Sequence, residues 1–267
     1  MRSSHTVQQV YERLVEAAPL ELAMGFDNPG LLVGDRGAQA GAVLLCLDIT
    51  DRVIDEAIAL GCGVIVSHHP LFFELPKQLL ADAQGPVGRA IRLLRAGLSA
   101  ICLHTNMDVA QGGVNDLLLG KLGLSPEAGP PPEGGEGFIG RIGSLRMALR
   151  PAELAAEVRR RLGCDAVRYV AGHGEVRRVA VVGGAGGGFY EAAAAQGCDA
   201  LVTAEVKHHH FLEAEALGLT LVDAGHFHTE RFVVERFEAL IGAGCPGLAI
   251  HRSRTVDRDL VQTISSY

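Results

Sequence analysis

Histidines gather at a few places in this 267-residue chain, and imidazole is the side chain best suited to bind metals or move protons near neutral pH. Eight of the eleven histidines lie in four segments that each follow a predicted strand: His68-His69, His104, His208-His209-His210, and His226 with His228. The carboxylates Asp108 and Glu230 lie at two of the same strand ends. The carboxyl ends of parallel strands form the ligand-binding edge of an open sheet, so we expect these side chains to act together.

The pair His68-His69 closes the apolar run 63–66, which is typical of a short buried strand. Pro70 favours extended backbone at His69, so the strand ends in a loop from which both rings can reach one crevice. Taken alone, two adjacent histidines are more often an ordinary polar loop than a pair of ligands. The other histidine and carboxylate clusters favour the functional interpretation.

His226 and Glu230 are four residues apart and would share one face of a helix that starts at the preceding glycine. A histidine and a carboxylate at this spacing can bind one ion, although an isolated pair is more often a solvated helix face. Together with His68-His69 and with His104 four residues before Asp108, the pair predicts a metal site. Histidine and carboxylate without sulfur suit zinc, iron, manganese or similar divalent ions.

Composition limits the class of protein. A hydrophobic content of 48%, a charged content of 21% and a net charge of −7 indicate a globular protein and argue against nucleic-acid binding by bulk electrostatics. No apolar run is long enough to span a membrane, and the N-terminal residues resemble neither a secretory signal nor a transit peptide. The six cysteines form no Cys-x-x-Cys pair. We therefore expect a cytoplasmic protein with reduced thiols.

Strands and helices alternate along the chain, which predicts an α/β fold with largely parallel sheets. Helices are expected over 7–18, 53–60, 87–96, 151–162 and 189–195, and strands over 42–47, 63–66, 99–103, 141–149, 179–182 and 219–223. The pattern repeats, since segment 61–69 lines up with segment 197–205. We expect a duplicated α/β unit that forms two facing lobes, with the polar strand ends in one cleft. The predicted parts are a lobe of residues 1–124 with 222–267, a linker over 125–135 and a second lobe over 136–221.

The glycine-rich run 183–188 follows a predicted strand and opens a helix. Its backbone amides could hold a phosphate, as such turns do at helix N-termini. The run lacks the lysine and hydroxyl residue of a Walker loop, so a simple tight turn is the favoured interpretation.

Five motifs together resemble the Nif-three-like (NGG-one-interacting-factor-three) family of dinuclear-metal proteins, also catalogued as GTP cyclohydrolase I type 2 homologues. The motifs run through nearly the whole chain in the order of that family: 27–34 (DNPGLLVG), 67–70 (SHHP), 104–108 (HTNMD), 203–209 (TAEVKHH) and 223–230 (DAGHFHTE). The resemblance implies a dinuclear metal site in the cleft between the lobes.

The ligands that the resemblance implies are His68, His69, Asp108, His226 and Glu230. Glu230 would bridge two divalent ions, one held by His69 and Asp108 and the other by His68 and His226. Chemistry agrees, because a carboxylate can bridge two ions while a neutral imidazole serves one.

Three further histidines lie in the same motifs. We interpret His104 and His209 as proton-transfer or ligand-supporting groups, because they lie beside the implied ligands but are not needed among them. His228 departs from the family pattern, in which a glutamate or another polar residue is usual at this place.

The resemblance implies a metal-dependent hydrolase whose metal-activated water attacks carbon eight of guanine in GTP, opening the imidazole ring and releasing formate. The small-molecule substrate would then be a nucleotide. A metal-dependent phosphoesterase is an alternative, and so is a metal-binding or adaptor protein without turnover, since the family takes its name from a protein interaction. The resemblance also implies a homo-oligomer, commonly a homohexamer.

Overall fold

The computed structural model describes residues 5–127, 137–256 and 258–262, which form a mixed α/β protein with two sheets. The chain divides into two compact units. Unit 1 comprises Met1–Gln111 with Val233–Arg258, and unit 2 comprises Gly112–Phe232 with Asp259–Tyr267. Within the described ranges, no helix is long and apolar enough to cross a membrane.

Unit 1 is built on a five-stranded sheet with the order β1-β4-β3-β2-β11. Its strands are β1 (Gly30–Val33), β2 (Ala42–Cys46), β3 (Val64–Ser67), β4 (Ser99–Cys102) and β11 (Ala249–Arg252). β11, β2, β3 and β4 are parallel, and β1 pairs with β4 in the antiparallel direction. Every residue of β2, β3 and β4 is buried, which explains why these strands have nearly continuous apolar sequences.

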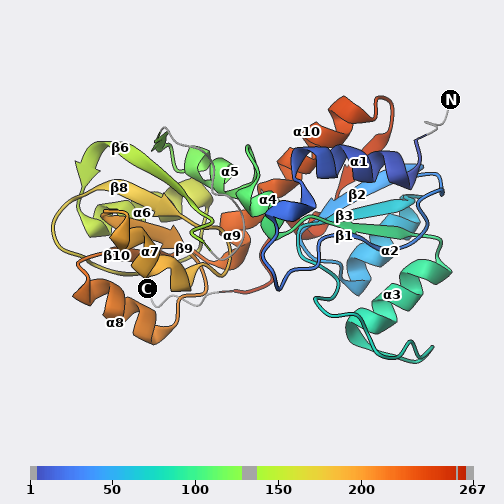
Figure 1. The fold of residues 1–267 in the computed structure, drawn as a ribbon, viewed down its shortest axis with the longest axis horizontal. Coiled ribbons are helices and arrows are strands. Elements are labelled where there is room, and N and C mark those ends of the chain that lie inside the picture. Colours follow the sequence, from blue (N-terminus) through green and yellow to red (C-terminus); the bar gives the residue numbers. More distant parts are fainter. Residues whose placement is uncertain (1–4, 128–136, 257, 263–267) are drawn as a thin grey trace. The chain divides into compact units, whose positions relative to one another are not determined.

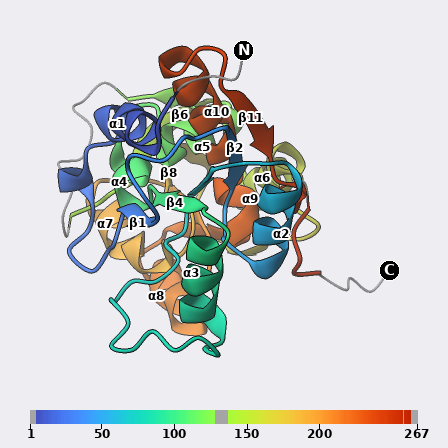
Figure 2. The same cartoon turned by 90° about the vertical axis from the view of Figure 1, so that its right-hand side faces the viewer.

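Helices cover both faces of this sheet. α1 (Val7–Ala17) and α10 (Val233–Gly244) pack together on one face, while α2 (Asp51–Ala59) and α3 (Gly85–Arg95) lie on the other (Figures 1 and 2). α2 begins after Thr50, whose hydroxyl accepts a hydrogen bond from the backbone N–H of Val53 at 3.3 Å, so the predicted N-cap is present. Three short helices complete the unit: η1 (Leu20–Leu22), α4 (Thr105–Val109) and η3 (Arg254–Val256).

Unit 2 is built on a six-stranded sheet with the order β5-β6-β8-β9-β10-β7. Its strands are β5 (Ser125–Pro126), β6 (Arg141–Leu149), β7 (Arg168–Val170), β8 (Val176–Val181), β9 (Ala200–Thr203) and β10 (Thr220–Asp223). β8, β9 and β10 are parallel, and β7 is antiparallel to β10. This arrangement repeats that of unit 1, where β2, β3 and β4 are parallel and β1 is antiparallel to β4.

The helices of unit 2 also cover two faces. α5 (Val114–Lys121) and α6 (Pro151–Leu162) bury their leucines and valines against β8, β9 and β10 in one core cluster. α7 (Tyr190–Ala195) packs on β9 and α8 (His208–Ala216) packs on β10, and the two helices contact each other. The short helices are η2 (Gly187–Phe189) and α9 (His226–Glu230).

The limits of the two units differ from those expected of the lobes. α5 packs on β6 and β8, and α9 packs on α5, so both helices belong to unit 2. The expected linker over 125–135 begins with β5, which pairs with β6. The part of that linker from residue 128 onward lies outside the described residues.

Candidate metal centre

Three imidazoles of unit 1 lie together at the carboxyl ends of β3 and β4. His68 and His69 follow β3, and His104 follows β4. The ring centroids are 5.1 Å apart for His68 and His69, 5.3 Å for His68 and His104, and 5.7 Å for His69 and His104. One ring nitrogen from each lies within 4.8 Å of the other two, so these histidines form a group that could hold a metal ion.

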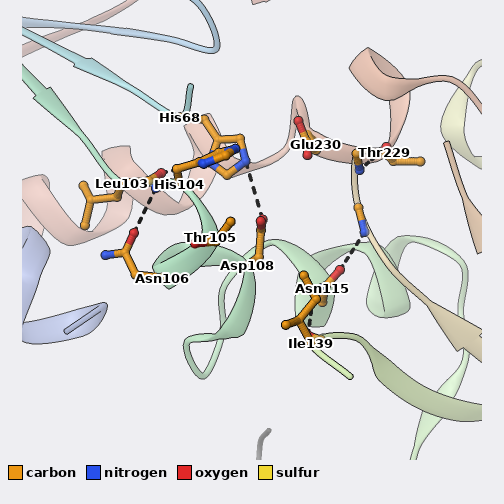
Figure 3. Close-up of polar contacts among 12 residues, drawn as sticks. His68, Leu103, His104, Thr105, Asn106, Asp108, Asn115, Ile139, Thr229 and Glu230 are labelled. Atoms are coloured by element: carbon orange, nitrogen blue, oxygen red, sulfur yellow. Dashed lines mark hydrogen bonds and ion pairs between the residues drawn. The ribbon is translucent and has the colours of Figure 1, made fainter. Parts of the chain in front are cut away.

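His68 is fully buried, and its hydrogen bonds determine which nitrogen can bind a metal. Its Nδ1 lies 2.9 Å from the carbonyl oxygen of Leu103, which only accepts, so Nδ1 carries the hydrogen. The lone pair is therefore on Nε2, 3.5 Å from Oδ1 of Asp108 (Figure 3). Ligands of one tetrahedral zinc ion, each about 2.0–2.2 Å from it, lie roughly 3–3.5 Å apart. The donor pair of His68 and Asp108 therefore fits a shared cation.

A carboxylate orients each of the other two rings. Nδ1 of His69 lies 2.8 Å from Oδ1 of Asp48, and Nδ1 of His104 lies 2.9 Å from Oδ1 of Asp27. Such a carboxylate fixes the tautomer and directs Nε2 toward a metal or substrate. Sequence reasoning did not identify either aspartate as part of the site, although Asp48 follows a buried strand, as His68 does.

Asp27 is held in its ionised form. Burial by itself raises the pKa of this carboxyl, but hydrogen bonds from His104 and Thr105 outweigh burial and lower the pKa to about 2. The backbone N–H of Thr105 donates to Oδ2 of Asp27 at 2.9 Å, and the Thr105 hydroxyl donates to the same oxygen. The imidazole of His104 is therefore hydrogen-bonded to a carboxylate that stays negatively charged.

In unit 2, the predicted pair His226 and Glu230 lies on α9, and the expected helix after the glycine is present. Nε2 of His226 is 2.9 Å from Oε2 of Glu230, and Nδ1 of the same ring is 2.6 Å from Oε1 of Glu205. Glu230 is 3% exposed, so a buried carboxylate faces a ring nitrogen. This donor pair is also suited to a cation.

Glu205 has an uncommon backbone conformation, with φ of 52° in the left-handed region. The backbone that follows Glu205 and the backbone that precedes His226 are both fixed by Asp223. Its two side-chain oxygens accept hydrogen bonds from the backbone N–H groups of Val206 at 3.2 Å and Gly225 at 3.1 Å. Side chains in such strained positions often serve a functional site. Sequence reasoning missed Glu205 as a partner of His226, although the repeat aligns Glu205 with His69.

The glycine run after β8 lies against Glu230. The backbone N–H of Gly183 donates to Oδ1 of Asn115 at 2.7 Å, and that of Gly184 donates to the hydroxyl of Thr229 at 3.0 Å (Figure 3). The side chains of Asn115 and Thr229 thus accept the hydrogen bonds of these two amides, which would otherwise be donated to a phosphate. This supports the tight-turn interpretation over a phosphate loop. A Cβ added to Gly184 would lie 2.1 Å from Oε1 of Glu230.

Replacing Gly184 with alanine is therefore expected to displace Glu230 and reduce the bound metal. The new methyl group would clash with Oε1 of Glu230, and φ of +61° costs an alanine about 1–2 kcal/mol. Gly188→Ala is the matched control, because a Cβ there meets no atom within 4 Å. Thermal unfolding and elemental analysis of both variants test the prediction. Equal stability and metal content in the two would contradict it.

His209 and His228 have other neighbours in the structure. His209 is exposed in the first turn of α8, and its ring lies 4.4 Å from that of His210. Nε2 of His228 faces Asp259 at 3.7 Å, and burial lowers the pKa of His228. Of the predicted ligands, unit 1 carries His68, His69 and Asp108, and unit 2 carries His226 and Glu230.

Several known proteins are similar to this chain in sequence. It is 35% identical over 219 residues to a protein of Clostridium perfringens, a match that covers 80% of this chain and 83% of the relative. It is 38% identical over 222 residues to a protein of Streptomyces coelicolor, with 79% and 77% covered. Both relatives are named GTP cyclohydrolase 1 type 2 homolog.

The fold is also found in solved structures. Staphylococcus aureus hypothetical protein SA1388 matches with a TM-score of 0.84 and 25% identity, covering 97% of this chain and 99% of that one. A Bacillus cereus protein related to NIF3 matches with a TM-score of 0.84 and 24% identity, covering 99% and 100%. The family model of Duf34/NIF3 (NGG1p interacting factor 3) matches residues 5–257. This match, together with the sequence relatives, shows that the chain belongs to the Duf34/NIF3 family.

Proposed function

We propose that this chain is a dinuclear metal-dependent hydrolase that binds two divalent cations through His68, His69, Asp108, His226 and Glu230. The observation that supports the proposal most is the orientation of the imidazoles of His68, His69 and His226. In each ring Nδ1 is bonded to an oxygen of the same unit, which leaves Nε2 as the ligand atom. Nitrogen and carboxylate donors without sulfur suit zinc, iron or manganese.

Glu230 is proposed as the ligand common to both cations. It is buried beside His226, and the glycine at position 184 leaves room for its carboxylate. A carboxylate offers two oxygens with separate lone pairs, whereas each imidazole in this set has one ligand atom. When bound, a pair of cations supplies an activated water and polarises the bond to be broken.

The proposed substrate is a nucleotide, and the proposed reaction opens the imidazole ring of guanine in GTP with release of formate. Support comes from the name of the sequence relatives, GTP cyclohydrolase 1 type 2 homolog. His104 is proposed to transfer a proton, since Asp27 holds its Nδ1 and leaves Nε2 to accept or donate one. Of the two predicted proton-transfer residues, His104 has the ring oriented for this task, while His209 is exposed on α8.

The test begins with elemental analysis of protein loaded separately with zinc, manganese and iron(II). We expect about two ions per chain and metal-dependent release of formate from GTP. Phosphate release from p-nitrophenyl phosphate without formate would indicate a phosphoesterase instead. Two tightly held ions without turnover of either substrate would favour a metal-binding protein, and absence of metal binding would refute the proposal.

Assembly gives a separate prediction. A homohexamer is proposed from the family resemblance, so light scattering at micromolar concentration should give a mass six times that of one chain. A mass equal to one chain under these conditions would contradict the prediction. Repeating the measurement on metal-free protein would show whether assembly depends on the cations.

A further inference from the structure

Two phenylalanine rings of unit 1 are exposed next to His104. Phe26 is 61% exposed and Phe73 is 50% exposed, although aromatic rings usually contribute their large area to a core. Their centroids are 6.1 Å apart, and Phe73 lies 5.7 Å from the His104 ring in an edge arrangement. The pair therefore forms an apolar surface that adjoins the histidine cluster.

Hydrogen bonds of the Asp27-Asn28 turn hold this surface beside His104. Asp27 accepts from Nδ1 of His104, and it also accepts from the backbone N–H of Asn28 at 2.7 Å. The side-chain amide of Asn28 donates to the carbonyl oxygen of Phe72 at 2.8 Å. The segment that carries one exposed ring is thus tied both to the loop that carries the other and to the imidazole. These hydrogen bonds fix the backbone beside each phenylalanine.

We propose that Phe26 and Phe73 form a bent platform, with ring planes 49° apart, on which a planar aromatic or heteroaromatic ring of the substrate stacks against one phenyl face and contacts the other ring obliquely, with its edge toward His104. The faces of aromatic side chains stack on any flat π-system, and this contact tolerates differences in ring substituents. The same loop exposes Leu75, Leu79 and Leu80, but these aliphatic side chains have no flat face. The proposal rests on the proposed function, because it places the substrate ring beside the proton-transferring His104.

The sequence contains no tryptophan, so Phe26→Trp introduces a single indole into the platform. We expect guanosine monophosphate to quench its fluorescence in a saturable way, and ribose 5-phosphate to leave it unchanged. Adenosine monophosphate should also quench, because stacking does not depend on the base edges. Adding Phe73→Leu should weaken the apparent affinity for guanosine monophosphate by about 5- to 150-fold, the usual contribution of one stacked ring.

The control is Leu94→Trp on α3, at a position that is 56% exposed. Its emission should decrease only through absorption of light by the nucleotide. Saturable quenching of this control, an equal response of Phe26→Trp to ribose 5-phosphate, or no saturable response would overturn the proposal. An emission that changes with protein concentration would overturn it as well, because a second copy of the chain would then cover the rings. Phe73→Trp repeats the measurement if Phe26→Trp does not fold.

Measurements on metal-free protein separate this proposal from the proposed function. Quenching by guanosine monophosphate should persist without metal, since the argument uses only the two rings. Stacking without metal-dependent turnover would support the platform and refute the hydrolase. Metal-dependent turnover of GTP without stacking would support the hydrolase and refute the platform.

Discussion

Replacing Glu230 with alanine is expected to remove both cations, whereas Asp108→Ala should empty mainly one of the two sites. Glu230 is buried, and Nε2 of His226 lies 2.9 Å from its Oε2, so its loss leaves that imidazole without the neighbouring carboxylate. If Glu230 bridges, each cation loses a ligand in this variant, while Asp108→Ala removes a donor from a single cation.

Elemental analysis of the two variants after identical metal loading and desalting measures the effect. Glu215→Ala, at an exposed position of α8, is the matched control and should retain both ions. Circular dichroism shows whether each variant is folded, so that metal loss is not confused with unfolding. Full metal retention in Glu230→Ala would refute the bridging role.

Replacing His104 with alanine is expected to slow turnover by roughly two to four orders of magnitude and to leave the metal content nearly intact. A positioned acid or base contributes about this much to the rate. The ring is held for such a role, with Nδ1 bonded to the ionised Asp27 and Nε2 left for proton transfer. If His104 instead supports the ligands, its loss should weaken metal binding by about ten- to a hundredfold.

Asp27→Asn is the matched variant for this prediction, since it keeps the shape of the partner and removes its charge. An amide can bond to either tautomer of His104, so the fixed orientation is lost while the ring remains. We expect turnover to fall in this variant too, with metal binding retained. Metal affinity and formate release, measured on the same preparations, distinguish a loss of proton transfer from a loss of metal binding. Loss of metal in proportion to activity would assign both residues to metal binding.

Much of the fold can be predicted because the central strands are buried on both faces. The runs that form β2, β3 and β4 are almost entirely apolar and are followed by polar residues, so the sequence indicates both the strand and the adjoining site residues. The edge strand β11 has exposed and half-buried positions and gives no such signal. It was missed, as was the antiparallel strand β7, whose three residues are also largely exposed.

The candidate site, too, is only partly predictable from the sequence. Adjacent and four-spaced histidines and carboxylates are visible as local patterns, and α9 is present where the His226–Glu230 spacing predicts a helix. The partners that orient the rings are remote in sequence. Asp27 is 77 residues from His104, and Glu205 is 21 residues from His226. Only folding brings such pairs together, so spacing rules do not reveal them.

The discontinuous path of the chain through unit 1 affects how this protein is made. β2 forms its parallel ladder with β11, and α1 packs on α10, yet both partners belong to the late segment Val233–Arg258. A ribosome adding about 5–20 residues per second needs roughly 6–24 s to synthesise the intervening segment Gly112–Phe232. During that interval β2 lacks its partner β11 on the edge opposite β3, and an unprotected edge invites pairing with other chains. Unit 1 therefore begins to emerge first but lacks β11 and α10 until most of unit 2 has been synthesised, and this incomplete form is the one that we expect chaperones to bind.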